Sequence, residues 1–334
     1  MLIDWRVAAA AAVFCAGAVF TCIESNAQAI PKEVAARVEM HTIPSLTLSD
    51  QQFLTGDTNG AQPVTMAGEL RIAQGIGRLP AVVLMHGSGG ISPTMEAWAR
   101  QLNSQGISTF VIDGFSGRGL TSVNQDQAKL GRLNFILDIF GALEILARHP
   151  RVDPDRIVLM GFSRGGQGAL YASLKRFNEM WNRSGAQFAA YIAFYPDCAT
   201  TYAGDTDVVD RPIRIFHGTP DDYNPVATCK AFVGRLEAEK RDVTLTEYPD
   251  SQHGFDAGLL GVSSNAVASG AQTVRNCRIR ESEGGVLVNA ETQAPFSYKD
   301  ACVETNPHVG GNPATAQEAR KAVSDFLQAL FKLG

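Results

Sequence analysis

Residues 156 to 173, RIVLMGFSRGGQGALYAS, decide the fold of this 334-residue chain. An apolar run ends at Gly161, a lone serine follows at position 163, and glycines occupy positions 165 and 166. The apolar run predicts a buried strand, and the pattern after it predicts a helix. A strand-to-helix turn of this kind is a nucleophile elbow, which leaves the hydroxyl of Ser163 exposed. The alternative is a glycine-rich turn in which the serine is incidental.

Strand-like and helix-like segments alternate on both sides of this turn. Further strands are predicted at AVVLM (81–85), STFVIDGF (108–115), QFAAYIAFYP (187–196), PIRIFHG (212–218) and DVTLTEYP (242–249). Helices are predicted at 94–104, about 124–148, 165–177, 225–240 and about 314–332. Mostly apolar strands separated by helices indicate an α/β fold, with a mainly parallel sheet covered by helices on both faces.

The composition is that of an ordinary globular domain, with 45% hydrophobic and 19% charged residues and a net charge of −5. Basic residues form no run or stripe, so we expect no nucleic-acid partner. We expect residues 30–334 to form a single domain with an insertion at about 257–313, a segment rich in Gly, Ser and Asn. A structureless loop of that length is unusual in a compact domain, and Cys277 and Cys302 are placed to staple it.

Residues 1–29 have the features of a signal peptide for export to the periplasm or the medium. Residues 7–23 are apolar, and Ala27-Gln28-Ala29 provides the small-x-small pattern that a signal peptidase requires. An uncleaved membrane anchor is the alternative, although the apolar span is short and dominated by alanine. Neither Cys15 nor Cys22 lies in a convincing lipobox, so we do not expect a lipid anchor. After cleavage we expect no membrane association.

Cleavage would leave an even number of cysteines: Cys198, Cys229, Cys277 and Cys302. In an exported chain this number suggests two disulfides, and three pairings are possible. Four reduced, buried thiols are the alternative if the chain is not exported.

Two further strand ends carry reactive side chains, and ligands bind beyond the carboxyl ends of parallel strands. A serine nucleophile needs a histidine base, which in turn needs an acid to orient its ring. Asp221 follows the strand PIRIFHG and is preferred to Asp222 as that acid. Either aspartate, or Asn224, could instead cap the helix that begins near Pro225.

His253 follows the next strand, which gives the chain order Ser163, Asp221, His253 of α/β hydrolases. His86 and His217 lie in His-Gly turns, where a neutral ring can bond nearby backbone. The remaining histidines lie before the core strands, at a helix end or in the insertion, and we expect none to be the base: His41, His149 and His308.

The segment LMHGSGG, residues 84–90, ends an early strand in a glycine-rich turn. Attack on an ester carbonyl places negative charge on oxygen, and preorganised backbone N–H groups stabilise it. We expect one N–H donor from Arg164 and a second from Ser88, in preference to Gly89. A phosphate-binding loop is the alternative, but neither of the usual phosphate-loop spacings is present.

With these residues in place, the chain resembles the dienelactone hydrolase family of α/β hydrolases. The motifs that carry the resemblance lie between about residues 80 and 256: VVLMHGSGG, VIDGFSGRG, GFSRGG, FYPDC, HGTPDDYNP and QHGFD. The resemblance implies an α/β-hydrolase fold, a Cys or Ser nucleophile with Asp and His, no metal or other cofactor, and hydrolysis of esters or lactones. The best-known members use cysteine where this chain has Ser163, which favours a general carboxylic ester hydrolase. The insertion and the export signal also distinguish this chain from compact cytoplasmic members.

The fold implied by the resemblance places the strand that ends near Cys198 beside the strand that bears Asp221. Cys229 lies in the following helix, so the resemblance implies the disulfide Cys198–Cys229 and leaves Cys277 to pair with Cys302. Two arginines, Arg118 and Arg164, could bind an anionic substrate group. We expect Arg118 to pair with an acidic neighbour and Arg164 to point away from the pocket, whereas Tyr223 either lines the pocket or packs.

The leading hypothesis is an exported serine hydrolase that cleaves small-molecule esters or lactones through an acyl-enzyme on Ser163. A serine peptidase of the same fold is the nearest alternative, although the chain lacks a large accessory domain that would filter peptides. A non-catalytic binding protein with the same fold is a further alternative. Loss of Ser163, Asp221 or His253 would have indicated it, but all three are present.

Overall fold

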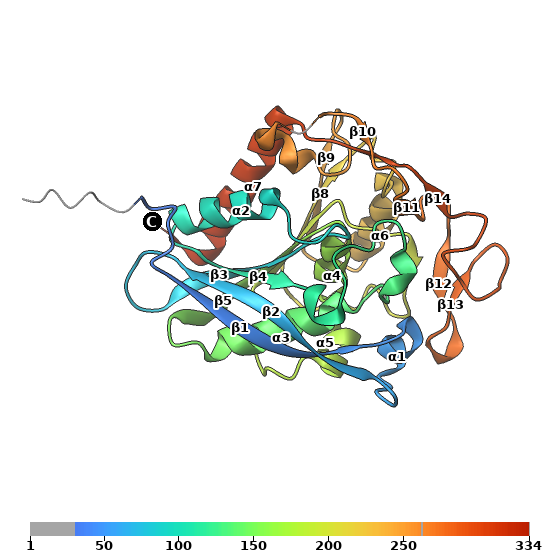
Figure 1. The fold of residues 1–334 in the computed structure, drawn as a ribbon, viewed down its shortest axis with the longest axis horizontal. Helices are drawn as coiled ribbons and strands as arrows, with labels where there is room; N and C mark the ends of the chain where they lie inside the picture. Colours follow the sequence, from blue (N-terminus) through green and yellow to red (C-terminus); the bar gives the residue numbers. More distant parts are fainter. Residues whose placement is uncertain (1–30, 262, 334) are drawn as a thin grey trace, which may run out of the picture. The chain divides into compact units, whose positions relative to one another are not determined.

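The computed structural model describes residues 31–261 and 263–333, so the predicted export signal lies outside the described residues. An eight-stranded sheet with the order β1-β2-β4-β3-β5-β6-β8-β9 forms the centre (Figure 1). Strand β2 runs antiparallel to β1 and β4, and the pairs from β4 across to β9 are parallel. The strands are β1 (Arg37–Thr47), β2 (Gln62–Ile72), β3 (Leu79–Met85), β4 (Ser108–Asp113), β5 (Val152–Phe162), β6 (Ala190–Phe194), β8 (Ile213–Gly218) and β9 (Val243–Tyr248).

Helices cover both faces of this sheet. The two on one face are α2 (Pro93–Ser104) and α7 (Pro313–Phe331), and those on the other include α3 (Phe135–Arg148), α4 (Arg164–Tyr171) and α6 (Val226–Ala238). Successive strand side chains point to opposite faces, so each strand contributes to two cores. Val82 and Leu84 of β3 pack with α2 and α7, whereas Val83 packs on the opposite side. The predicted α/β-hydrolase fold is confirmed.

The helix expected from about residue 124 begins only at Phe135, so that boundary was wrong. The segment before it contains a short 3-10 turn, η2 (Gln127–Lys129), one extended residue, Leu130, and a turn at 132–134. The Asn134 side chain bonds both the N–H and the carbonyl of Leu48, each at 2.8 Å. This contact with a distant part of the chain starts the helix late and leaves Gln127 in a loop.

The helix expected at 165–177 is divided into α4 and α5 (Lys175–Trp181). Between them, the carbonyl of Ser173 accepts a hydrogen bond from the N–H of Val209 (2.8 Å), and Lys175 N–H donates to Asp207 O (2.9 Å). Both partners lie in a loop about 34 residues further along the chain, which the local helical pattern could not reveal. A short helix, α1 (Asp50–Thr55), and a 3-10 turn, η1 (Ser116–Arg118), complete the core.

The insertion is built from very short strand pairs beside the core. Its elements are η3 (Phe255–Leu260), β10 (Ala266–Val267), β11 (Gln272–Thr273), β12 (Ile279–Glu281), η4 (Glu283–Gly285), β13 (Leu287–Asn289), β14 (Glu304–Thr305) and β15 (His308–Val309). Strand β12 pairs with β13 and with β7 (Thr200–Thr201) of the core, β10 pairs with β15, and β11 pairs with β14. In Figure 1 the strands β10 to β14 lie along the right side, whereas η3 packs against α7.

The two ends of the insertion meet at one point. Asn312 N–H donates to the carbonyl of Phe255 (2.9 Å), and Gly310 N–H donates to the carbonyl of His253 (2.8 Å). The backbones approach so closely that a Cβ on Gly258 would lie 2.3 Å from the carbonyl carbon of Asn312. The insertion therefore leaves the core and returns to it through a narrow neck.

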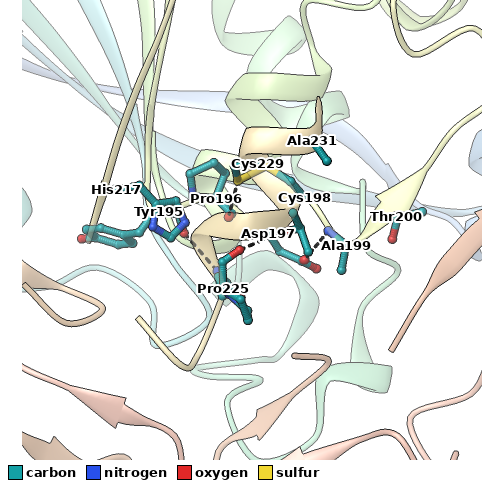
Figure 2. Close-up of a disulfide and its surroundings, with 12 residues drawn as sticks. Tyr195, Pro196, Asp197, Cys198, Ala199, Thr200, His217, Pro225, Cys229 and Ala231 are labelled. Atoms are coloured by element: carbon teal, nitrogen blue, oxygen red, sulfur yellow. Dashed lines mark hydrogen bonds between the residues drawn. A yellow bond between two sulfur atoms is a disulfide. The ribbon is translucent and has the colours of Figure 1, made fainter. Parts of the chain in front are cut away.

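The described residues contain two disulfides, Cys198–Cys229 and Cys277–Cys302, which is the pairing that the family resemblance implied. The first ties the segment after β6 to helix α6, as Figure 2 shows. The second closes a 25-residue separation inside the insertion. Two disulfides are consistent with export. Across residues 31–261 and 263–333, no helix has both the length and the hydrophobicity to span a membrane.

Candidate active site

The elbow at the end of β5 holds Ser163 in a strained conformation, with φ of +55° and ψ of −118°. A side chain on Gly161 would place its Cβ 2.0 Å from the carbonyl oxygen of Gly165, and one on Gly165 would lie 2.2 Å from Met85 O. Only glycine fits these two positions, which explains the spacing around the serine. Ser163 N–H donates to the carbonyl of Phe194 (2.9 Å) and so fastens the elbow to β6.

Ser163, His253 and Asp221 form a continuous chain of hydrogen bonds. The Oγ of Ser163 lies 2.9 Å from Nε2 of His253, and Nδ1 of His253 lies 2.8 Å from Oδ2 of Asp221. The other oxygen of Asp221 accepts the N–H groups of Tyr223 and Asn224, both at 2.9 Å. A carboxylate held in this way keeps the proton of His253 on Nδ1, so the lone pair of Nε2 faces the serine hydroxyl.

Asp222 has a different environment from Asp221. It accepts the backbone N–H of His308 (2.7 Å), contacts Nδ1 of His308 (2.9 Å) and pairs with Arg275 (2.7 Å). Partial burial raises the pKa of Asp222, but the hydrogen bonds from His308 and the charge of Arg275 together lower it below its usual value. The structure therefore brings Asp221 to His253, while Asp222 fastens the insertion.

The alternative of a helix cap for these residues does not hold. The N-cap of α6 is Pro225, which makes no side-chain cap. Asn224 instead donates its side-chain amide to the carbonyl of Tyr195 (3.0 Å).

The two expected oxyanion donors come from residues near Ser163: Arg164 follows it in the chain, and a Cβ on Gly87, next to Ser88, would lie 3.1 Å from Ser163 Cβ. Arg164 is the first residue of α4, so its N–H has no partner inside the helix, and the helix dipole there favours an anion. Among the described residues, neither Ser88 N–H nor Arg164 N–H has an acceptor. Both Ser88 and Arg164 line a cavity that also exposes Ser163.

His86 holds the turn that carries Ser88. Its Nδ1 donates to Gly87 O (2.7 Å), and its Nε2 accepts the N–H of Gly114 (3.0 Å). Burial lowers the pKa of His86 to about 4, so the ring is neutral near pH 7. His217 is likewise buried, bonds Gly218 O (3.1 Å) and has a pKa lowered by burial. Among the described histidines, only His253 is hydrogen-bonded to Ser163.

Two tyrosines hold the ring of His253: Tyr223, which both lines the cavities and packs, and Tyr195, which the sequence did not single out. The ring of Tyr223 stacks on it with centroids 4.6 Å apart, and the ring of Tyr195 packs at 4.5 Å. Tyr195 has a φ of +37°, which is unusual for a residue with a side chain. Its hydroxyl donates to Asp256 (2.6 Å), whose other oxygen accepts Nε1–H of Trp98 (2.8 Å). Burial raises the pKa of Asp256 above its usual value.

Two cavities of different size meet at Ser163. The smaller has a volume of about 30 Å³ and the larger about 350 Å³. Ser88, Ser163 and Tyr223 line both. The small cavity is otherwise walled by polar core residues and by four residues of the insertion: Gln272, Thr273, Val274 and Tyr298.

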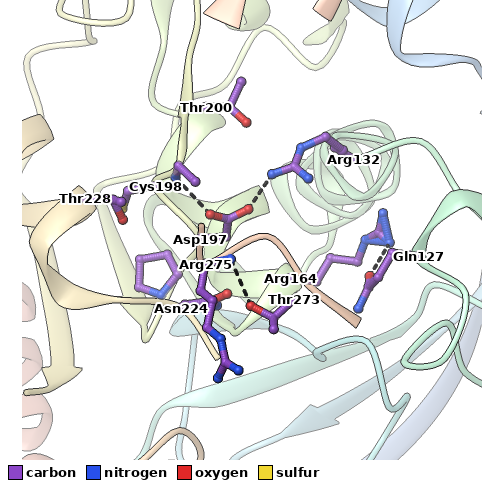
Figure 3. A network of polar contacts seen from close by, with 12 residues as sticks. Gln127, Arg132, Arg164, Asp197, Cys198, Thr200, Asn224, Thr228, Thr273 and Arg275 are labelled. Carbon is purple, nitrogen blue, oxygen red and sulfur yellow. Dashed lines mark hydrogen bonds and ion pairs between the residues drawn. The ribbon is translucent and has the colours of Figure 1, made fainter. Parts of the chain in front are cut away.

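Two buried guanidinium groups lie in the wall of the small cavity (Figure 3). Arg132 pairs with Asp197 and donates to the hydroxyl of Tyr298 (2.6 Å). Arg164 donates to Leu130 O (2.6 Å) and to Gln127 (3.3 Å). No acidic side chain of the described residues forms an ion pair with Arg164, and burial lowers its pKa.

The expectation that Arg164 points away from the pocket is therefore wrong. The loop that replaces the start of the predicted helix brings Gln127 to its guanidinium and holds it at the cavity. Arg118 pairs with Asp138 through contacts of 2.7 and 2.9 Å, as expected.

One group of the described side chains has the spacing of a metal site: Glu39, His41 and His149. It lies on β1 and after α3, away from Ser163 in the fold. Nδ1 of His149 accepts the N–H of Arg151 (3.2 Å), so the proton is on Nε2, which faces Glu39 (3.2 Å). A ring in this tautomer has no lone pair to offer an ion at that position.

Comparison with known proteins places this geometry in context. A sequence model of the dienelactone hydrolase family matches residues 66–275. Thiohydrolase aneE from Aspergillus aculeatus is 29% identical over 131 residues, which is 38% of this chain and 37% of that protein. An uncharacterized peptidase, YtmA from Bacillus subtilis, is 32% identical over 85 residues, or 25% of this chain and 30% of that protein. The chain thus matches only about a third of the length of these curated relatives.

Among solved structures, a dienelactone hydrolase-like promiscuous phosphotriesterase from metagenomic libraries has a similar fold. The TM-score is 0.52 at 16% identity, covering 87% of this chain and 98% of the other. At this identity the likeness concerns the fold alone. It extends over most of the insertion-bearing chain, beyond the segment that the family model matches.

Proposed function

Because this chain belongs to the dienelactone hydrolase family, we propose that it is a serine hydrolase that cleaves small-molecule carboxylic esters or lactones. The observation that carries the proposal is the chain of contacts from Ser163 Oγ to His253 Nε2 (2.9 Å) and from His253 Nδ1 to Asp221 (2.8 Å). A nucleophile, a base and an orienting acid at these distances are the requirement for acyl transfer.

Acylation begins with attack by Ser163 Oγ on the carbonyl carbon of the substrate. His253 Nε2 takes the hydroxyl proton, and the negative charge of Asp221 stabilises the imidazolium that forms. The carbonyl oxygen becomes an oxyanion, which the N–H groups of Ser88 and Arg164 are placed to bind. Removal of one such donor typically costs about 3 kcal/mol in the transition state.

Collapse of this intermediate breaks the bond to the leaving oxygen, and His253 gives its proton to that oxygen. The acyl group is then bonded to Ser163 as an ester. A water molecule attacks this ester with His253 as base, and the second collapse releases the acid and restores the serine hydroxyl. Both half-reactions use the same side chains, the same two backbone N–H groups and one water molecule.

We also propose that the chain is exported, as residues 1–29 predict. The support is indirect and comes from the two disulfides, which form and persist in oxidising compartments.

The test is labelling of the folded protein by a fluorophosphonate probe together with hydrolysis of 4-nitrophenyl acetate. We expect both in the mature chain and neither in Ser163→Ala. Ser116→Ala, which changes an exposed serine in η1, is the matched control and should retain both. A non-catalytic binding protein would be folded yet unlabelled. A peptidase would be labelled and would also cleave the internal peptide bonds of unactivated oligopeptides, which an esterase would leave intact.

A further inference from the structure

We infer that the site selects esters that join a short acyl group to a larger apolar alcohol. The small cavity takes the acyl group and the large cavity takes the alcohol. This inference rests on the proposed function, because it assigns the two sides of a substrate that Ser163 attacks.

The first step is the position of the leaving alcohol. In the tetrahedral intermediate the reacting carbon carries Ser163 Oγ, the oxyanion, the leaving oxygen and the acyl substituent. The leaving oxygen must lie within reach of His253 Nε2, which protonates it. Of the two cavities, His253 lines only the larger one within the part of the chain that the structure describes. The alcohol therefore enters the large cavity.

The second step is the position of the acyl group. Ser88 and Arg164, whose N–H groups would bind the oxyanion, both border the small cavity, so the oxyanion takes part of its space and the acyl substituent beside it is assigned to the rest. Its volume of about 30 Å³ has room for only one or two water-sized groups. An acetyl methyl group fits this space, whereas each further methylene must displace part of the wall.

The wall of the small cavity is firmly held. Arg132 is fixed by Asp197 and by the hydroxyl of Tyr298 (2.6 Å). The hydroxyl of Thr273 donates to the carbonyl of Tyr223 (2.6 Å), which ties the insertion to the core at this point. An alkyl chain forced into this wall would also meet the buried guanidinium of Arg164 and offer it no hydrogen-bond acceptor.

The large cavity has the opposite character. Its volume of about 350 Å³ lies in the range of pockets that bind small organic ligands. Its apolar lining includes Met95, Phe162, Ala257, Ala268 and Val309. An aliphatic or aryl alcohol would bury this surface, at about 25 cal/mol per Å².

The test uses two isomeric esters, hexyl acetate and ethyl hexanoate, which have the same atoms and nearly the same hydrophobicity. We expect kcat/KM for hexyl acetate to exceed that for ethyl hexanoate by at least about 30-fold, measured by acid release at constant pH. Equal values, or a preference for ethyl hexanoate, would overturn the inference while leaving the proposed function intact. Failure of the proposed function differs from this result, because neither isomer would be cleaved and Ser163 would stay unlabelled.

A pair of variants tests which cavity holds which side. Val274→Ala enlarges the small cavity and should raise the relative rate on ethyl hexanoate several-fold. Ala268→Val narrows the large cavity and should lower the rate on hexyl acetate more than that on methyl acetate. An isomer ratio that Val274→Ala does not move would contradict the assignment. If that variant does not fold, the isomer ratio of the unaltered chain still decides the inference.

Discussion

In the core, Ser163, Asp221 and His253 lie directly after three strands of one sheet, whereas the insertion reaches the same cavities from strands of only two or three residues. The core positions its residues through strand register and close backbone contacts. The insertion positions its residues through a disulfide and through contacts with single core residues, such as the pairing of Arg275 with Asp222.

The core and the insertion therefore contribute to different properties: the core to the chemical step, and the insertion to the choice of substrate. The groups that would transfer protons and bind the oxyanion all come from the core. Both cavities, however, have walls from the insertion: Val274 and Tyr298 in the small one, Ala268 and Val309 in the large one. A change in the core should therefore alter the rate on every ester, and a change in the insertion should mainly alter which ester is preferred.

The adjacent aspartates provide the strongest test of this division. Asp221→Asn should lower kcat on 4-nitrophenyl acetate by about 10³- to 10⁴-fold, because an amide no longer holds His253 in the required tautomer. Asp222→Asn should keep kcat within about tenfold while weakening the attachment of the insertion. Both variants should be checked for folding by circular dichroism. An equal loss of kcat in a folded Asp222→Asn protein would remove the distinction.

The two disulfides extend the comparison to stability. Each closes a loop whose loss costs about 3 to 4 kcal/mol in the simple entropy estimate, from sequence separations of 31 and 25. Replacing Cys198 and Cys229 by serine should lower the free energy of global unfolding by about this amount. Replacing Cys277 and Cys302 should instead speed proteolysis within 257–313 and reduce the preference for hexyl acetate. Global destabilisation of the same size in both pairs would show that the insertion unfolds only with the core.

His86 makes the core sensitive to acid. Its pKa is about 4 in the folded protein and 6.5 in the unfolded chain, so the unfolded chain takes up a proton first. The stability contributed by the neutral ring is complete above pH 6.5 and is lost as pH falls toward 4, by up to about 3 kcal/mol. Urea unfolding between pH 7 and 4 should show this loss. In His86→Gln the free energy of unfolding should depend less steeply on pH over this range. An unchanged pH dependence would mean that another titrating group causes the loss of stability.

Tyr195 lies where the core meets the start of the insertion, and we expect the smallest effect there. Tyr195→Phe removes the hydroxyl that bonds the buried carboxylate of Asp256. We expect kcat to fall by up to about tenfold, with little change in KM, because the ring of His253 would lose a fixed neighbour. Tyr248→Phe is the matched control, since among the described residues its buried hydroxyl has no partner. Equal effects of the two variants would argue against a positioning role for Tyr195.

Much of the core could be predicted because its signals are local. The apolar run before Gly161 and the glycines around Ser163 describe a strand and a tight turn without reference to distant residues. The order of Asp221 and His253 after their strands then follows from the sheet. The position of Asp221 after its strand also favoured it over Asp222. The role of Asp222 in holding the insertion could not be predicted, because no spacing in the sequence indicates its partners His308 and Arg275.

The errors all involve contacts between distant segments. Asn134 bonds the backbone of Leu48, and the helix therefore starts about eleven residues later than predicted. Gln127 is left in a loop that lines the small cavity. Gln127 in turn holds Arg164 at the cavity. Tyr195 and Asp256 are 61 residues apart and meet only after β6 and β9 are aligned. The periodicity of apolar residues indicates which face of a segment is buried. It carries no information about which distant residue contacts that segment.

The narrow neck of the insertion has a consequence for how this protein could change. The insertion leaves the core at Gly258 and rejoins it at Gly311, where the two backbones are in contact. Its length or sequence could therefore change without disturbing the central sheet. The junction itself is not free, because Gly310 donates to the carbonyl of His253. A replacement insertion that keeps residues 308–312 should keep His253 in place and retain catalysis, with a different ester preference. A replacement that deletes residues 308–312 should lower kcat, whichever residues it contributes to the two cavities.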